Sequence, residues 1–164
     1  MSQYGFDGID IDWEYPESPA RTDLVKITCQ QFDTTQDAGG SPDDGANFVE
    51  LVKEMRTAFG PDKAITIASQ ADKTKATNEH ISGLAQYIDM FNLMSYDYTV
   101  SDITESPITA PNEPLYPPPT SSGVWNDSVA VTIDAYLAAG VAPAKMSVGI
   151  AYYGHARYAP GLSG

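Results

Sequence analysis

The alternation of apolar and polar positions along the chain predicts strands that alternate with helices. Segments with a period of two, or with a continuous apolar run, are separated by segments with helical spacing. The predicted strands are residues 6–15, 64–68, 88–96 and 145–152. The predicted helical segments are residues 41–59, 81–84 and 126–139. This alternation is typical of a parallel α/β protein. By itself it does not distinguish an open doubly wound sheet from a barrel.

The first long helix carries start and stop signals at both ends. Ser41 is the expected N-cap, and Pro42 with the acids after it suits a first turn. Gly60 is the expected stop. For the last helix the expected cap is Asn126 and the expected end is Gly140. Apolar residues follow at helical spacing in the first helix, at Phe48, Leu51, Val52, Met55 and Phe59.

The connections between these elements are polar and contain no repeat. Residues 17–44 and 99–124 are rich in Pro, Gly, Ser and Thr, and we expect both to be long loops. No glycine-rich phosphate loop follows any predicted strand, which argues against a nucleotide-binding fold.

Composition and charge exclude several classes of partner. The chain has 164 residues and is 42% hydrophobic, which suffices for one modest domain with its own core. No apolar run approaches the roughly 20 residues of a membrane span. Lys and Arg number 9 against 22 Asp and Glu, a net charge of -13. With no basic stripe to neutralise phosphates, we expect no nucleic-acid partner. With no long apolar run, we expect no membrane partner.

The termini and the cysteine content predict a piece of a larger domain. Cys29 is the only cysteine, so the chain cannot form an internal disulfide. No charged segment followed by an apolar run marks a signal peptide at the N-terminus. Residues 4–9 already have the pattern of the approach to a buried strand.

The first predicted strand alternates acidic and apolar residues. Its acidic positions are Asp10, Asp12 and Glu14, which a strand points to one face. Asp7 has the opposite parity, but Gly8 permits a bulge, so the direction of Asp7 stays open. The opposite face is apolar, and we expect it to pack against helices through Ile9, Ile11 and Trp13.

Repulsion between these carboxylates predicts that one of them is protonated. Neighbours on one face of a strand lie roughly 6.5 Å apart. At an effective dielectric constant of about 20, two ionised carboxylates at that separation repel by about 2.5 kcal/mol. At least one of the three should therefore hold a proton near neutral pH. A glycosidase needs that state, because a protonated carboxylic acid can donate to a glycosidic oxygen.

Two other interpretations of this strand remain open on the residues alone. The acids could form the solvated face of a sheet, although parallel strands are normally covered on both faces. They could also bind calcium in a loop, because acids at alternate positions ligate that ion. The EF-hand spacing requires glycine at the position of Tyr15, which weakens the calcium interpretation.

At this point the chain resembles a known family. Residues 7–14 are similar to Asp-Gly-x-Asp-x-Asp-x-Glu, the signature of family-18 glycoside hydrolases. Residues 41–56 resemble the entry into the helix after the family's catalytic strand. Residues 91–98 resemble its Met-x-Tyr-Asp strand, and residues 145–154 its Gly-x-x-x-Tyr-Gly strand. The similarity spans most of the chain and is closest to bacterial-type chitinases.

The resemblance implies a partial (β/α)8 TIM barrel. In such barrels the active site lies at the carboxyl ends of the strands. A complete barrel takes about 250 residues. Residues 1–164 should therefore form part of a single catalytic domain, truncated at both ends and carrying roughly strands 4 to 7.

The resemblance also implies retention of configuration assisted by the substrate, the family's exception to the scheme of two carboxylates. Glu14 would protonate the leaving oxygen and then act as the base towards water. The nucleophile would be the substrate's own N-acetyl carbonyl. Asp12 would orient that group, and Asp10 would share the proton of Asp12. No metal or cofactor is implied.

The Met-x-Tyr-Asp resemblance assigns the remaining site residues. Tyr96 would bind the acetamide oxygen, and Asp97 would hold the distorted sugar. His155 stands where many relatives have arginine, which leaves one substrate contact open. The residues expected to line the cleft are Met94, Tyr98, Tyr15 and Tyr153. Met94 and Tyr98 fit plain core packing as well, and Tyr15 fits packing against its loop.

The implied substrate is chitin or a chitooligosaccharide, and the family implies a secreted protein of undetermined oligomeric state. A chitinase-like lectin without activity is a second hypothesis, although such relatives commonly replace the acid that is intact here as Glu14. An endo-β-N-acetylglucosaminidase is a third. Trp13 and Tyr15-Pro16 after the acid resemble chitinases more closely.

Overall fold

A computed structural model describes residues 3–16, 42–71, 80–99, 109–117 and 127–156. Cys29 and the predicted caps Ser41 and Asn126 lie outside these residues. The strands are β1 (Gly8–Ile11), β2 (Ala64–Ser69), β3 (Met90–Leu93) and β4 (Met146–Val148). The helices are α1 (Asp44–Phe59), α3 (Ile81–Leu84) and α4 (Val129–Ala138), with a 3-10 turn at Pro143–Lys145.

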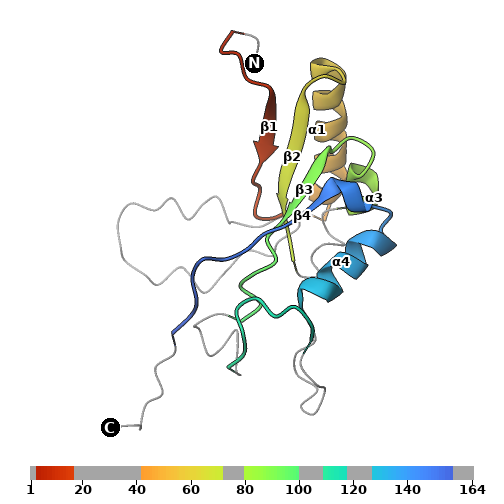
Figure 1. Ribbon diagram of the computed structural model, residues 1–164. Helices are drawn as coiled ribbons and strands as arrows, with labels where there is room; N and C mark the ends of the chain where they lie inside the picture. The colour runs from red at the N-terminus through yellow and green to blue at the C-terminus, as the bar shows by residue number, and fades with distance from the viewer. Residues whose placement is uncertain (1–2, 17–41, 72–79, 100–108, 118–126, 157–164) are drawn as a thin grey trace, which may run out of the picture.

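The four strands form one parallel sheet in the order β1-β2-β3-β4 (Figure 1). Each strand therefore pairs with the next one along the chain. Figure 1 also shows α1, α3 and α4 on one side of the sheet. A doubly wound sheet reverses its strand order and carries helices on both faces. Consecutive order with helices on one side is the arrangement of a barrel segment, as the resemblance implies.

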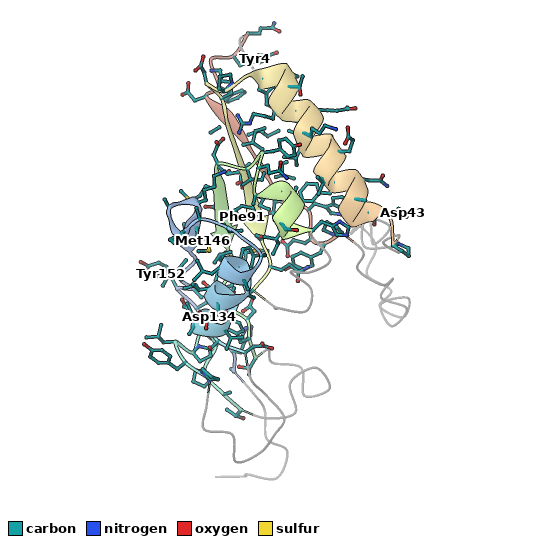
Figure 2. All side chains as sticks on the ribbon, turned by 90° about the vertical axis from the view of Figure 1, so that its right-hand side faces the viewer. Tyr4, Asp43, Phe91, Asp134, Met146 and Tyr152 are labelled. Carbon is teal, nitrogen blue, oxygen red and sulfur yellow. The ribbon has the colours of Figure 1, made fainter. Side chains whose placement is uncertain are left out.

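The core lies between the sheet and the helices. Alternate residues of β2 and β3 point to the helices and are almost completely buried, because neighbouring residues of a strand face opposite ways. In Figure 2, which views the helix-covered side, Phe91 lies between α1 and α4. Its ring makes an edge-on contact with Tyr136 of α4 at 5.8 Å. The main buried contributors are Phe48, Val52, Ile65, Ile67, Leu84, Phe91, Leu93 and Tyr136.

The helix ends differ from the sequence prediction in part. Helix α1 begins after Asp43, not Ser41. It ends before Gly60 as predicted, where a φ of 72° suits glycine. Helix α4 is capped by Ser128, whose Oγ accepts a hydrogen bond from the Val131 N–H at 3.3 Å. Of the apolar residues at helical spacing in α1, Phe48 and Val52 are buried and Leu51 is exposed.

The strands are shorter than predicted, and this places the candidate chemistry beyond their carboxyl ends. Strand β1 ends at Ile11, not Tyr15. Strand β3 ends at Leu93 and β4 at Val148. The residues that follow β1, β3 and β4 therefore lie in irregular backbone at the same end of the sheet. Loops at this end carry the active site in barrels of this kind.

The apolar face of β1 is less buried than expected. Ile11 packs against the core, but Ile9 is 39% exposed and Trp13 is 38% exposed. The reason is position, because β1 is the edge of the sheet and has a neighbouring strand on one side only. Trp13 does turn to the helix side, with its ring 5.5 Å from that of Phe48 on α1.

The opposite end of the sheet is braced by Arg56 of α1. Its guanidinium donates to the Tyr87 carbonyl at 2.8 Å and pairs with the Asp89 carboxylate at 2.5 Å. Burial tends to raise the pKa of Asp89, but the Ile65 N–H and Arg56 outweigh it and hold that pKa below its usual value. Among the described residues no helix is long and apolar enough to cross a membrane.

Candidate active site

The face of β1 that carries Asp10 is the one predicted. Thr66 Oγ1 on β2 and Asn92 Nδ2 on β3 both donate to Asp10 Oδ1, the latter at 3.2 Å. Thr66 and Asn92 alternate with core residues in their strands, so they and Asp10 occupy the face away from the helices. In a closed barrel that face is the interior.

Thr66 and Asn92 are site residues that the sequence analysis missed, as is Ser147. Ser147 Oγ on β4 donates to Asn92 Oδ1 at 2.8 Å. A usable signal was present. In each strand a polar residue stands between two apolar ones, and that pattern places it on the side opposite the core.

Asp12 and Glu14 follow β1 directly and are both exposed. Within the described part of the chain, no hydrogen bond or ion pair joins either side chain to another residue. Asp7 lies at the other end of β1, with Oδ1 3.7 Å from Lys63 Nζ. The backbone continues in register through Gly8 without a bulge, so Asp7 does not join the other acids.

Tyr96 connects the end of β3 to the acidic residues. Burial raises the pKa of Tyr96, and the negative charges of Asp97, Glu14 and Asp12 raise it further. These three carboxylates come from two separate segments, since Asp12 and Glu14 follow β1 and Asp97 follows β3. Tyr96 follows β3 and the acids Asp12 and Glu14 follow β1, so these residues lie at the same end of the sheet.

The ring of Tyr96 lies against the backbone of Gly149, the first residue after β4. A Cβ at Gly149 would lie 2.6 Å from the Leu93 carbonyl oxygen and 2.9 Å from Cε1 of Tyr96. The Gly149 N–H donates to that same Leu93 carbonyl at 2.8 Å. Only glycine permits this approach, so Gly149 fixes where Tyr96 can lie.

Asp97 is held from several directions. Its Oδ2 accepts a hydrogen bond from the Tyr153 hydroxyl at 2.7 Å, and its Oδ1 lies 2.7 Å from His155 Nε2. Its backbone N–H donates to Asn112 Oδ1 at 3.0 Å. Asp97 has a φ of 58°, in the left-handed region that aspartate tolerates better than most residues. These contacts fix both the backbone and the carboxylate.

Tyr153 is strongly biased towards its protonated form. Burial, the hydrogen bond to Asp97 and the charge of Asp97 raise the pKa of Tyr153 to about 12. At neutral pH it is therefore a hydrogen-bond donor. Its ring also makes edge-on contacts with Tyr96 at 6.1 Å and with His155 at 5.8 Å. Tyr153 thus joins the end of β3 to the end of β4.

The segment 109–117 supports this cluster from outside the sheet. Asn112 Nδ2 donates to the Tyr153 carbonyl at 3.4 Å, in addition to its contact with Asp97. Glu113 Oε2 accepts a hydrogen bond from the Ala151 N–H at 3.1 Å. Neither residue was found from the sequence, because both lie in a region that was interpreted only as a long loop.

The other residues expected to line the cleft are Met94, Tyr98 and Tyr15. The Tyr98 hydroxyl lies 2.6 Å from Thr132 Oγ1 of α4, so its polar end is engaged on the helix side. Met94 is half-buried, and its backbone N–H donates to the Ser69 carbonyl at 2.9 Å. Tyr15 follows Glu14 and is half-buried. Figure 2 shows Tyr152 pointing away from the core, and it is 98% exposed.

Within the described ranges, no group of three or more His, Cys, Asp or Glu side chains is arranged to hold a metal ion.

Comparison with known proteins gives a consistent family. The sequence profile described as "Glycosyl hydrolases family 18" matches residues 1–160. Chitinase A1 of Niallia circulans is 31% identical over 166 residues, covering 94% of this chain and 21% of the relative. The chain thus spans about a fifth of the length of that relative.

Solved structures agree with this result. The chitinase domain of the spore coat protein CotE from Clostridium difficile matches with a TM-score of 0.69 and 31% identity, over 94% of this chain and 40% of that one. A mutant of group II chitinase catalytic domain 2 from Ostrinia furnacalis, in complex with penta-N-acetylchitooctaose (NAG)5, matches with a TM-score of 0.70 and 27% identity. That match covers 91% of this chain and 35% of the other.

Proposed function

This chain belongs to family 18 of the glycosyl hydrolases, and on that premise we propose that it is part of a single catalytic domain that hydrolyses chitin or chitooligosaccharides. The observation that carries the proposal is that Asp12 and Glu14 follow β1, and Tyr96 and Asp97 follow β3, at the same end of a parallel sheet. The relatives named above are chitinases, and one of them was solved with an N-acetylchitooligosaccharide. Both facts support a polymer of β-1,4-linked N-acetylglucosamine as the substrate.

In the proposed mechanism Glu14 donates its proton to the glycosidic oxygen as the bond between that oxygen and C1 breaks. The carbonyl oxygen of the substrate's own acetamide attacks C1 and forms a cyclic oxazolinium ion. The Glu14 carboxylate then takes a proton from water, whose oxygen attacks C1 and reopens the ring. Two inversions give retention, and Glu14 ends in its starting protonated state.

Asp12 and Asp10 support the nucleophile. We infer that Asp12 accepts a hydrogen bond from the acetamide N–H, which aims the carbonyl oxygen at C1 and stabilises the positive charge that develops. Asp10 precedes Asp12 by two residues, and we infer that the two carboxyl groups share one proton. The exposed position of Asp12 beyond β1 leaves it accessible to a sugar, whereas Asp10 is already engaged by Thr66 and Asn92.

Tyr96 and Asp97 bind the reacting sugar in this scheme. The raised pKa of Tyr96 keeps its hydroxyl protonated at neutral pH, so it can donate to the acetamide oxygen. Asp97 is held by Tyr153 and His155, and we infer that it positions the ring in its distorted form. Preorganised groups of this kind lower the barrier because they need not rearrange during the reaction.

Met94, Tyr15, Tyr98 and Tyr153 are proposed to line the cleft. Tyr153 has direct support from its bond to Asp97. Tyr98 can contribute only its ring, because its hydroxyl is engaged by Thr132. By analogy with the family, the parent protein is proposed to be secreted.

The experiment uses the complete catalytic domain that contains this chain. Wild type, incubated with N-acetylchitooligosaccharides, is expected to release shorter oligomers, and Glu14→Gln is expected to release almost none. Tight oligosaccharide binding without hydrolysis by wild type would favour the lectin. Cleavage of N-glycans with no action on chitooligosaccharides would favour an endo-β-N-acetylglucosaminidase.

A further inference from the structure

A row of hydrogen-bonded side chains crosses the sheet on the face opposite the helices. One residue comes from each strand: Asp10 from β1, Thr66 from β2, Asn92 from β3 and Ser147 from β4. We propose that Thr66 and Asn92 are positioning residues for the Asp10 carboxylate, and that Ser147 fixes the amide of Asn92. This inference rests on the function proposed above for the acidic strand.

The strand register explains how residues so far apart in sequence meet. Asp10 lies directly opposite Thr66, and Asn92 lies directly opposite Ser147. Asp10 and Asn92 are separated by the whole of β2, and they are also offset along it, because Asp10 is opposite Thr66 whereas Asn92 is opposite Ala68. Their side chains therefore meet diagonally across β2, where the Asn92 amide reaches Asp10 Oδ1 at 3.2 Å.

The direction of the hydrogen bonds gives the row its chemical role. Thr66 Oγ1 and Asn92 Nδ2 donate to the same atom, Asp10 Oδ1. A carboxylate oxygen has two lone pairs, and these two donors use both. Among the described residues Oδ2 accepts no hydrogen bond, so it is the oxygen available for the interaction with Asp12 proposed above. The row therefore sets which oxygen of Asp10 takes part.

Ser147 determines which end of the Asn92 amide faces Asp10. Its hydroxyl donates to Asn92 Oδ1, which leaves the NH2 group directed at the carboxylate. The reverse orientation would place the amide carbonyl against a carboxylate oxygen, with two acceptors and no donor. Ser147 thus has only an indirect effect on Asp10, because it orients the Asn92 amide that donates to Asp10.

The matched variants are Thr66→Val and Thr66→Ser. Valine keeps the shape of threonine and removes the hydroxyl, whereas serine keeps the hydroxyl. In the complete domain we expect Thr66→Val to lower kcat about tenfold with KM nearly unchanged, the loss of one hydrogen bond to a charged group. Thr66→Ser should recover most of that loss. Thr57→Val, the same change at the exposed Thr57 of α1, is the control and should match wild type.

A double-mutant cycle tests whether Thr66 acts through Asp10. In the Asp10→Asn background, Thr66→Val is expected to reduce kcat by less than twofold, because the carboxylate it positions is already gone. Two outcomes overturn the proposal. One is a full additional loss of kcat in that background, and the other is a loss in Thr66→Ser as large as in Thr66→Val.

A spectroscopic measurement separates this proposal from the proposed function. The carboxyl carbon-13 signal of Asp10, assigned by its disappearance in Asp10→Asn, is expected to move in Thr66→Val and to stay in place in Thr66→Ser. A signal that does not move in Thr66→Val overturns the positioning role even if the domain hydrolyses chitooligosaccharides. A domain without hydrolysis refutes the proposed function, and the positioning role is then decided by this signal alone.

Discussion

Glu14 and Asp97 are exposed carboxylates beyond the ends of parallel strands, yet their surroundings differ sharply. Both oxygens of Asp97 are engaged, one by Tyr153 and one by His155. Glu14 has no hydrogen bond or ion pair to any residue in the described ranges. Asp97 follows β3, which has a neighbour on each side, whereas Glu14 follows the edge strand β1.

This difference separates two tasks within one site. A group that positions a substrate benefits from being fixed before the substrate arrives, since less freedom is lost on binding. A proton donor must gain and lose a proton in each turnover, and hydrogen bonds to its charged form would favour the ionised state over the acid. The fixed Asp97 carboxylate therefore fits the binding role proposed for it above, and the exposed Glu14 fits its proposed role as proton donor.

The comparison predicts that two amide substitutions in the complete domain both lower activity but differ in their effect on stability. Glu14→Gln should lower kcat by about 10² to 10⁴, the range for removing a general acid, and leave thermal stability unchanged. Asp97→Asn keeps a residue that tolerates the left-handed backbone, but it should destabilise the fold by about 1 kcal/mol as well as lowering activity. Kinetics and thermal unfolding of both variants decide this. Equal stability of the two would remove the distinction.

Gly149→Ala tests the comparison of Glu14 with Asp97 in a second way, because it should displace the ring of Tyr96. A Cβ there would lie 2.9 Å from the Tyr96 ring. Overpacking of this kind costs typically about 1–3 kcal/mol. We expect lower thermal stability together with a clear loss of kcat/KM. Gly154→Ala is the matched control, since a Cβ at Gly154 meets nothing within 4 Å. If the two variants behave alike, Gly149 does not position Tyr96.

The phenol of Tyr153 reports on the Asp97 cluster by titration. Its pKa of about 12 in the fold lies above the value of about 10 for a free tyrosine. A raised pKa of this kind gives stability that is present below pH 10 and is lost as the pH rises towards 12. Ultraviolet difference spectra of wild type against Tyr153→Phe give the midpoint. Asp97→Asn should lower it, and a midpoint near 10 in wild type would contradict the contact.

The smallest effect is expected at His155, which engages one oxygen of Asp97. His155→Ala should raise KM by a few-fold and change kcat little, since Tyr153 still holds the other oxygen. His155→Gln retains a donor at nearly the same place and should recover part of the loss. A large fall in kcat for His155→Ala, with KM unchanged, would contradict a positioning role and indicate that His155 takes part in the chemical step.

The parts of the fold governed by local pattern were predictable from the sequence. Helix α1 with its end at Gly60, strand β2 and the face of Asp10 follow from periodicity and turn residues. The strand ends were not, because apolar residues continue past Ile11 and Val148 while the hydrogen-bonded ladder stops there. Ladders depend on the neighbouring strand, which a single segment does not reveal.

The candidate site was predictable where one segment carries it and not where several must meet. The motifs in residues 7–14 and 91–98 predicted the acids of the first strand and Tyr96 with Asp97, and the roles of these residues stay predictions. Thr66, Asn92, Asn112 and Ser147 were missed, because each acts only through contacts made across strands or from a loop. The exposure of Ile9 was also unpredictable, since only the assembled sheet defines β1 as its edge.

The most direct test of the account is the dependence of the Glu14→Gln defect on the leaving group. The complete domain is assayed on a chitooligosaccharide and on the matching nitrophenyl glycoside, whose leaving group departs without a proton. If Glu14 is the proton donor, bond cleavage in Glu14→Gln falls far more on the chitooligosaccharide, by about 10² or more relative to the nitrophenyl substrate. Equal losses on the two substrates would contradict that role.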